Sequence, residues 1–413
     1  MVRATTMLLA AAFIPGVHAC TAFKVTSGGR TFIGNNEDSW CIHARIHFVP
    51  GSGGDLGAVY FSSWTGHPFL PWVDQLGMNA AGLVFDGLGI QPKDVAPAPG
   101  KPVVHFSELA HSMLERCQDV TEAVAFLQQH DLIFLHKSML FLADAQGNRA
   151  VVQNDTVLLG QEADFAVGNW RLACGTDMDA IPIPRLQKGR DLLKAGIAPT
   201  LEGALSVLQG MRSCREFLGN GTLFSTLFEP DRGKVHVYFY HDFAHPVAYD
   251  LREELTKGAR TVDLPSLFPP NAEFEALQRY RTPFHQRWLF MTLAALAGLA
   301  VLLGVIFAVA VLVQLVQRLR LRPVRTFWPL VLLGLGMVAL VALVGILLTL
   351  EQVVYFGLGD VHPALRLLPH VLLATALVAA LRLRRHPREH WALLPALALI
   401  VPVLVGCAYW GLF

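Results

Sequence analysis

The pattern of apolar and polar positions divides the chain into three parts. Residues 1–19 hold a short apolar run, residues 20–287 mix apolar and polar positions, and residues 288–413 are mostly apolar. Alternation over a few residues is typical of strands with one buried face, whereas an apolar run of about 20 residues can cross a membrane. We therefore expect a leader, a mixed helix-and-strand domain and a membrane part, in that order.

Residues 1–19 have the layout of a secretory signal peptide. Arg3 precedes an apolar stretch from Met7 to Ile14, and a Pro-Gly break then leads to Ala19. The apolar stretch is shorter than the roughly 20 residues of a membrane helix. We expect cleavage after Ala19, which makes Cys20 the first residue of the mature chain. The alternatives are an uncleaved anchor, a buried N-terminal strand, and a lipoprotein signal that acylates Cys20.

The apolar runs of the last part predict four membrane helices. The first two runs carry no charged residue within their apolar stretches, and the third is shorter and contains His370. None contains an inward acidic residue or lysine of the kind that marks an ion path. The part is therefore interpreted as an anchor or a platform for access to lipids. The predicted spans are about 289–313, 327–350, 364–382 and 391–412.

The charges of the connecting loops predict the orientation of these spans. The loops QRLRLRPVR (317–325) and RLRRHPREH (382–390) are rich in arginine, whereas the loop between them in sequence carries Glu351 and Asp360. The positive-inside rule places arginine-rich loops in the cytoplasm. The domain at residues 20–270, the linker at 271–287 and the C-terminus are then extracytoplasmic or at the outer surface. This agrees independently with an exporting signal peptide.

The composition excludes some classes of partner. The chain has 33 Lys and Arg against 32 Asp and Glu, a net charge of +1, whereas a nucleic-acid binder needs a basic face. Its histidines show no spacing typical of metal ligands, so we expect no metal and no cofactor. Five cysteines lie in the exported domain, and an odd number leaves one thiol free if the others pair. Cys20 is the expected free thiol.

Cleavage before Cys20 would give this residue two reactive groups. An α-amino group has a pKa of about 7.7–8.0, so it can accept the thiol proton near neutral pH. Its protonated form also lowers the pKa of the neighbouring thiol. One residue then supplies both the nucleophile and the base, which an internal cysteine cannot do.

The stretch after Cys20 predicts a hairpin. TAFKV and TFIG have the pattern of strands, and SGG between them is typical of a tight turn. The hairpin would bring the sequence NNED back toward Cys20. Asp38 or Glu37 could then contact the α-ammonium group, and Asn35 or Asn36 could position a substrate.

Three stretches of the domain are similar to a known family. They are CTAFKVTSGGRTFIGNNED from Cys20, GMNAAGLVFDGLGI from Gly77, and YFYHDFAHPVAYDLREELTKGARTVDLPSLF up to Phe268. These stretches resemble the choloylglycine hydrolase and penicillin V acylase group of N-terminal nucleophile hydrolases, which is related to isopenicillin-N acyltransferase and the linear-amide hydrolases. The resemblance implies an α+β fold, a four-layered αββα sandwich. Helical spacing at 106–130 and 184–211 and strand patterns at 137–155 and 234–242 fit this fold.

The resemblance also implies roles for individual residues. It implies Cys20 as the nucleophile, Asp38 as the carboxylate that orients the α-amine, and Asn169 as a donor to the oxyanion. It implies Arg185 as the family's later catalytic arginine, whereas the alternative is that the basic residues of this stretch, Lys188 and Arg190 included, are ordinary charges on a helix surface. Asn169 alternatively is a turn residue after its preceding glycine. The asparagines expected to contact substrate are Asn35, Asn36 and Asn79.

Two positions depart from the pattern of the bile-salt-type members of this family. This chain has Asn35 where those members carry an arginine, and Gly89 where they carry an asparagine. The first departure makes bile salts less suitable substrates. The second requires a backbone N–H as second oxyanion donor, or an altered site.

These observations favour a membrane-anchored amidase or acylase that cleaves a linear carbon–nitrogen amide through an acyl-thioester on Cys20. Expected partners are a small or lipid-like N-acyl amide and membrane lipids. The alternatives are an N-acyltransferase that uses the same acyl-enzyme, and a non-catalytic membrane receptor or assembly module on the same fold.

Overall fold

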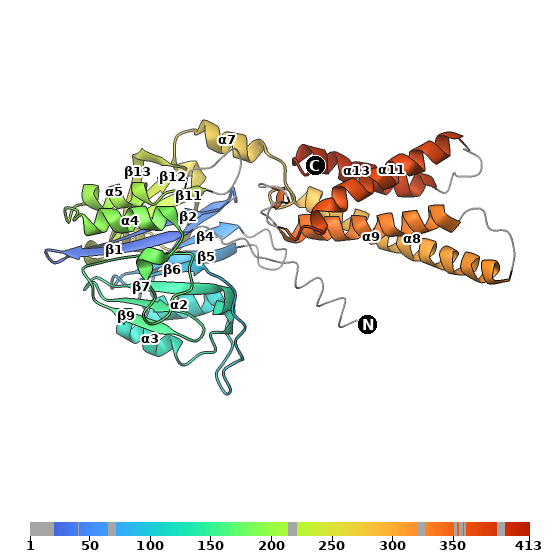
Figure 1. Cartoon of the computed structure of the whole chain (residues 1–413). Coiled ribbons are helices and arrows are strands. Elements are labelled where there is room, and N and C mark those ends of the chain that lie inside the picture. The colour runs from blue at the N-terminus through green and yellow to red at the C-terminus, as the bar shows by residue number, and fades with distance from the viewer. Residues whose placement is uncertain are drawn as a thin grey trace. The chain divides into compact units, whose positions relative to one another are not determined.

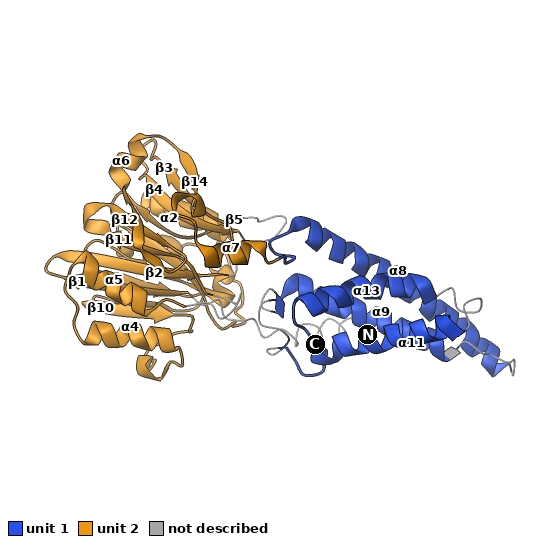
Figure 2. Cartoon of the chain, turned by 90° about the horizontal axis from the view of Figure 1, so that it is seen from above, with its two compact units in different colours: residues 1–16, 281–413 blue, residues 17–280 orange. Residues whose placement is uncertain are grey.

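The computed structural model describes residues 20–39, 41–64, 72–213, 221–320, 327–350, 353–354, 358, 361–385 and 393–413. The predicted signal peptide at 1–19 lies outside the described residues. The chain divides into two compact units, residues 17–280 and residues 281–413 together with 1–16 (Figure 2). We call them the sandwich unit and the helical unit.

A six-stranded antiparallel sheet forms one half of the sandwich unit. Its second and third strands form the predicted hairpin. In spatial order the strands are β10 (Asp164–Gly168), β1 (Thr21–Ser27), β2 (Arg30–Asp38), β11 (Thr222–Glu229), β12 (Lys234–Phe239) and β13 (Asp242–Asp250).

An eight-stranded antiparallel sheet forms the other half. All of its neighbouring strands run antiparallel. In spatial order they are β14 (Arg260–Asp263), β3 (Ala44–Val49), β4 (Ala58–Trp64), β5 (Trp72–Asn79), β6 (Val84–Gly89), β7 (Ser138–Ala143), β8 (Arg149–Val152) and β9 (Val157–Gly160).

The predicted hairpin after Cys20 is confirmed. Strands β1 and β2 pair from Thr21 opposite Asn36 to Ser27 opposite Arg30. Gly28 and Gly29 connect them with φ angles of 60° and 75°, a left-handed conformation that glycine adopts without steric cost. The sequence NNED therefore ends β2 beside the start of β1.

Helices cover the outer faces of the two sheets. Helices α4 (Pro184–Lys194) and α5 (Leu201–Gly210) contact the six-stranded sheet, and α2 (Phe106–Arg116) and α3 (Val120–Leu127) contact the eight-stranded sheet (Figure 1). The continuous helical patterns at 106–130 and 184–211 are each broken in two. Asp119 and Thr200 are the N-caps of the second helix in each pair. Their side chains accept hydrogen bonds from backbone N–H groups of the first turn that follows.

Aromatic side chains fill the space between the sheets. Phe61 of β4 lies 5.9 Å from Phe224 and 6.1 Å from Phe228, both in β11, between ring centroids. Phe141 of β7 stacks on Phe165 of β10 at 6.0 Å. The order of layers is thus helix, sheet, sheet, helix, as the sequence predicts. Of two further short helices, α6 (Leu251–Thr256) lies between β13 and β14, and α7 (Ala272–Arg279) follows β14.

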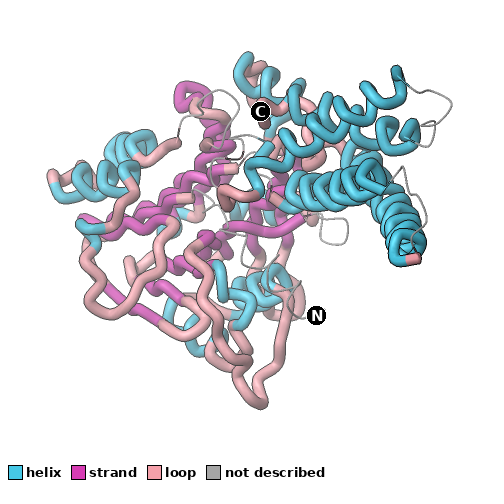
Figure 3. The backbone as a smooth tube through the Cα atoms, turned by 45° about the vertical axis from the view of Figure 1, so that its right-hand side comes forward, coloured by secondary structure: helices cyan, strands magenta, loops and turns pink. Residues whose placement is uncertain are grey.

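The described part of the helical unit is built from helices (Figure 3), and these helices are apolar. Side chains such as Leu302 and Val309 of α8 are 60% and 55% exposed, which is typical of a surface that faces lipid rather than water. The helices are α8 (Arg287–Leu319), α9 (Phe327–Thr349), α11 (Leu368–Arg385) and α13 (Leu394–Tyr409).

By length and composition, three of the described helices could cross a membrane, which is one fewer than the sequence predicts. The third of these includes the short turn that precedes α11 and starts at Leu365. The predicted fourth span at 391–412 gives only the 16-residue α13, with Pro402 inside it. Sixteen helical residues reach about 24 Å, less than the roughly 30 Å of a hydrocarbon core.

Replacing Gly34 with alanine should destabilise the hairpin that carries the site. An added Cβ would lie 2.1 Å from Cε1 of Phe23, a fully buried ring. We expect a loss of about 1–3 kcal/mol and a fall of roughly 3–10 °C in the Tm of the detergent-solubilised chain, followed by circular dichroism. Gly168→Ala is the matched control, because its nearest contact would be an ordinary 3.5 Å. Equal effects of the two substitutions would contradict this packing.

Candidate active site

Cys20 directly precedes β1, the second strand of the six-stranded sheet. Only 4% of the residue is exposed. Because Thr21 pairs with Asn36 on one side and with Gly168 on the other, the antiparallel registers place Cys20 between Glu37 and Asn169. Its Sγ lies 3.5 Å from Oε2 of Glu37 and 4.0 Å from the backbone oxygen of Asp38.

The other predicted catalytic residues form one connected network. The Thr222 hydroxyl donates to Oδ1 of Asp38 at 2.5 Å, and Nε of Arg185 lies 3.5 Å from Oδ2 of Asp38. Nη2 of Arg185 donates to Oδ1 of Asn169 at 3.0 Å. Nδ2 of Asn169 in turn donates to the backbone oxygen of Gly89 at 2.8 Å. The structure thus brings Asp38, Asn169 and Arg185 together, next to the strand that carries Cys20.

Three elements hold this network. Asp38 is the last residue of β2, and Thr222 is the residue opposite it in β11. Arg185 is in the first turn of α4, which contacts both β1 and β10. Asn169 follows the last residue of β10 directly. Since β10 and β2 flank β1, side chains distant in sequence meet at one end of this sheet.

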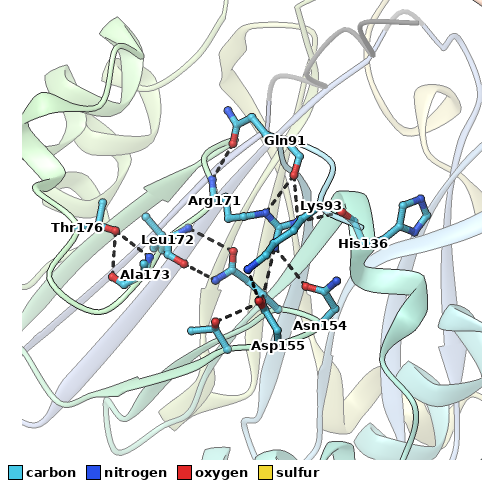
Figure 4. Close-up of polar contacts among 11 residues, drawn as sticks. Gln91, Lys93, His136, Asn154, Asp155, Arg171, Leu172, Ala173 and Thr176 are labelled. Atoms are coloured by element: carbon cyan, nitrogen blue, oxygen red, sulfur yellow. Dashed lines mark hydrogen bonds and ion pairs between the residues drawn. The ribbon is translucent and has the colours of Figure 1, made fainter. Parts of the chain in front are cut away.

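The loop that carries Asn169 is fixed by a second polar cluster (Figure 4). The guanidinium of Arg171 donates to the backbone oxygens of Gln91 and His136, at 3.0 and 2.9 Å from Nη2. The Gln91 side chain accepts a hydrogen bond from the Arg171 backbone N–H at 2.8 Å and donates one to the backbone oxygen of Asn169 at 3.3 Å. The segments after β6 and after β10 are therefore tied together, and the Gly89–Asn169 bond lies between them.

Asn35 and Asn36 point to opposite faces of β2, as neighbours in a strand do. Nδ2 of Asn35 donates to Oδ2 of Asp86 in β6 at 2.6 Å, across the space between the sheets. Asn36 faces the helix layer, where it donates to the backbone oxygen of Leu208 at 3.0 Å and accepts from the Ser225 hydroxyl at 2.6 Å. Of the two, only Asn35 is on the face of Glu37.

Asn79 is not brought to this network. It is fully buried, and its Nδ2 donates to the backbone oxygens of Leu114 and Cys117 at 2.8 and 2.7 Å. Its Oδ1 accepts from the backbone N–H groups of Ala81 and Leu83. These bonds use the hydrogen-bonding capacity of the amide, so Asn79 joins the turn after β5 to α2 rather than offering a group to a substrate.

The sequence analysis missed Asp86 and Thr222. Asp86 is 1% exposed and lies in β6, whose sequence VFDGLG is otherwise free of charge. An acidic residue inside an apolar strand is a signal that could have been recognised, because carboxylates are almost never fully buried without a partner. Thr222 gave no comparable signal, since threonine is common in strands.

The electrostatics of the site oppose ionisation of the thiol. Burial raises the pKa of Cys20 well above its usual range, and the carboxylates of Glu37, Asp38 and Asp86 raise it further. Burial raises the pKa of Glu37 as well, and repulsion from Asp86 adds to it. Burial also raises the pKa of Asp86 to about 7, although the hydrogen bond from Asn35 acts in the opposite direction. A thiolate in this site requires an additional positive charge.

The other cysteines and possible metal ligands contribute nothing to this network. Cys20, Cys117 and Cys174 are free thiols, so Cys20 is unpaired as expected, while Cys214 lies outside the described residues. Within the described ranges, no group of three His, Cys, Asp or Glu side chains could hold a metal ion.

Comparisons with known proteins found likeness among solved structures alone. No protein-family model matches the chain, and no curated protein does. Penicillin V acylase from Agrobacterium tumefaciens is similar with 17% identity and a TM-score of 0.47, over 59% of this chain and 92% of that one. Two variants of conjugated bile acid hydrolase from Clostridium perfringens have 14% identity and TM-scores of 0.46 and 0.45, over 61% of this chain and 97% of theirs.

Replacing Glu37 with glutamine should make the Cys20 thiol easier to ionise. The change removes a like charge 3.5 Å from Sγ, so we expect the pH profile of Cys20 alkylation by iodoacetamide to move down by about 1–3 units. Alkylation is measured for each cysteine-containing peptide by mass spectrometry. Asp74→Asn is the matched control, because that carboxylate contacts Ser62 and His111 instead. An unchanged or upward-shifted profile would contradict the assigned contact.

Proposed function

We propose that the sandwich unit is an amide hydrolase whose nucleophile is the thiol of Cys20 at a mature N-terminus. The observation that carries this proposal is the juxtaposition of Cys20 with Glu37, Asp38 and Asn169, all at most 4% exposed. Three carboxyl groups surround a buried thiol, and Arg185 beside Asp38 is the cation that the described residues supply there. An α-ammonium group on Cys20 would add a positive charge where the site needs one.

The free α-amine is proposed to start the reaction. It takes the thiol proton, and the sulfur attacks the carbonyl carbon of the amide while the carbonyl π electrons move to oxygen. The tetrahedral intermediate then collapses and breaks the carbon–nitrogen bond. The leaving amine receives the proton from the α-ammonium, and an acyl-thioester remains on Cys20. Water attacks this thioester in the same way, releasing a carboxylic acid and restoring the thiol.

Asn169 is proposed to stabilise the negative oxygen of the intermediate. Its side chain is oriented by two bonds, because Oδ1 accepts from Arg185 and one Nδ2 hydrogen goes to Gly89. The second Nδ2 hydrogen has no acceptor among the described residues and is available to the oxyanion. One such donor is worth about 2.7–4 kcal/mol in transition-state stabilisation.

Asp38 and Arg185 are proposed as positioning residues. The Thr222 hydroxyl and Arg185 hold the Asp38 carboxylate at the end of β2, and its backbone oxygen is near Sγ of Cys20. In this position the carboxylate can orient the α-amine once the leader is removed. Arg185 links it to Asn169, so one guanidinium holds both the base-orienting and the oxyanion-binding side chains.

The apolar C-terminal helices support a membrane-bound enzyme. With the arginine-rich loops at 317–325 and 382–390 in the cytoplasm, the sandwich unit would work outside it, where signal peptides are removed. Lipid-like N-acyl amides partition near a bilayer and are therefore proposed as the first substrates to screen. Acyl transfer to an amine would share the same acyl-enzyme and is distinguished by its product.

The purified chain should begin with Cys-Thr-Ala-Phe, and an acyl-reactive thiol probe should label Cys20. Cys20→Ala should abolish both labelling and amide hydrolysis, because no other residue combines a thiol and a free amine. Edman sequencing gives the first residue, and mass spectrometry locates the label. Cys174→Ser is the matched control, since Cys174 is an exposed free thiol. A retained leader or an acylated Cys20 in an active enzyme would refute the mechanism.

A reporter fused after Phe413 tests the proposed orientation. If the segment that contains α13 also crosses the membrane, as the sequence predicts, the number of crossings is even and the sandwich unit and the C-terminus both lie outside, so alkaline phosphatase fused there should be active in a bacterial host. A fusion within the 382–390 loop should be inactive as phosphatase, and serves as the opposite control. An inactive fusion after Phe413 together with an active fusion in the 382–390 loop would show the opposite orientation. Inactivity of the fusion after Phe413 in a chain whose sandwich unit lies outside would indicate an odd number of crossings.

A further inference from the structure

Two buried carboxyl groups lie near the nucleophile, close enough for each to affect the same thiol. Glu37 of β2 contacts Sγ of Cys20, and Asp86 of β6 accepts from Asn35, which is two residues before Glu37 on the same face of β2. Glu37 and Asp86 are only 4% and 1% exposed, and repulsion between them raises the pKa of Glu37. We call Asn35, Glu37 and Asp86 the acidic wall.

The acidic wall has hydrogen-bond acceptors that nothing in the described structure satisfies. Oδ1 of Asn35 and Oδ1 of Asp86 are both buried without a hydrogen-bond partner among the described residues. Nδ2 of Asn35 donates a hydrogen bond to Oδ2 of Asp86, so the two unsatisfied oxygens lie close to each other. Unsatisfied buried acceptors cost free energy, and two of them in one place indicate a missing donor.

The charges around Cys20 indicate what kind of donor is missing. Arg185 is on the Asp38 side of the site, and the proposed α-ammonium of Cys20 would add one further positive charge. Glu37, Asp38 and Asp86 can carry three negative charges, one more than the positive charges that Arg185 and the α-ammonium would provide. Buried carboxylates are stable when a cation with hydrogen bonds compensates them.

The nearby lysine does not fill this role. Lys24 is on β1, but its ammonium group donates to the backbone oxygens of Gly147 and Glu162 at the far end of the hairpin. Arg45 stacks on the Trp72 ring at 3.8 Å, and Arg212 lies over the Phe243 ring at 5.9 Å. The acidic wall therefore lacks a cation from the described part of the chain.

We propose that the acidic wall binds a protonated amine of the substrate, so that the enzyme prefers amides with a positive charge close to the scissile bond. This inference rests on the proposed amide hydrolysis at Cys20. An ammonium group offers three donors, enough for the two unsatisfied oxygens and one carboxylate oxygen of the wall. The resulting preference is opposite to that of a site with an arginine at position 35, which would select anionic groups.

Pairs of near-isosteric substrates test the preference on the mature full-length chain. An N-hexanoyl amide of ethylenediamine is compared with that of propylamine, and 3-aminopropanoyl anilide with butanoyl anilide. We expect kcat/KM to favour the cationic member at least about tenfold in one of the two pairs, as one charge-assisted hydrogen bond provides. The pair that responds shows whether the wall contacts the leaving amine or the acyl group. Equal or lower kcat/KM for both cationic members would overturn the proposal.

Two isosteric variants then assign the preference to the wall. In Asp86→Asn and Glu37→Gln, the ratio of kcat/KM between the cationic and neutral members should fall toward one. Asp74→Asn removes a carboxylate that contacts Ser62 and His111, and should leave the ratio as in the wild type. A ratio that persists in both wall variants, or falls equally in Asp74→Asn, would contradict the assignment.

A binding measurement separates this inference from the proposed function. Hexylammonium, hexanol and hexanoate are compared for protection of Cys20 against iodoacetamide. Protection by hexylammonium alone, lost in Asp86→Asn, would support the cation site even in a chain that hydrolyses no amide. Amide hydrolysis without such protection and without a cationic preference would leave the hydrolase proposal intact and overturn this one.

Discussion

The pairing of β1 with its two neighbours is the constraint on which the candidate site depends. Strand β1 is short, but its registers with β2 and β10 place Glu37 and Asn169 on either side of Cys20. A slip of one residue in either register would turn every side chain of that strand to the other face of the sheet. Gly34 allows Phe23 to pack against β2 and the two turn glycines close the hairpin, so backbone geometry and core packing fix the register together.

The helix layer then connects the ends of these strands. Arg185 starts α4 after Pro184, and from there its guanidinium reaches both Asp38 and Asn169. The cluster around Arg171 holds the neighbouring loop from the opposite side, through Gln91. The side chains of Asp38 and Asn169 are thus each held by hydrogen bonds or ion pairs to residues on other elements. Such support is what a site needs when its geometry must be kept to a fraction of an ångström.

Local patterns predicted much of this arrangement. Alternation and the SGG turn were sufficient to predict the hairpin. Helical spacing predicted the two stretches that form the four outer helices. The breaks within them, at Cys117–Asp119 and Ala195–Thr200, depend on capping and were not predicted. The partners of Asn36 and Asn79 could not be predicted from local patterns. Both lie in motifs similar to a family pattern, yet their amides bond to α5, β11 and α2, and a sequence does not reveal which face or which helix a side chain meets. Asp86 meets Asn35 through contact between two sheets, which no local pattern encodes. The apolar run at 391–412 is longer than α13, so the hydropathy pattern alone overestimates the length of the last helix.

The burial of Cys20 also has a consequence for the order of events during biogenesis. The residue is 4% exposed and flanked on both sides by paired strands, whereas a signal peptidase must hold its substrate as an extended, accessible strand. With the proposed cleavage after position 19, the cut has to come before β1 joins the sheet. Chains that fold first would shield the bond from the peptidase. Translocation would therefore be coupled to enzyme maturation, and copies that stay in the cytosol would remain latent.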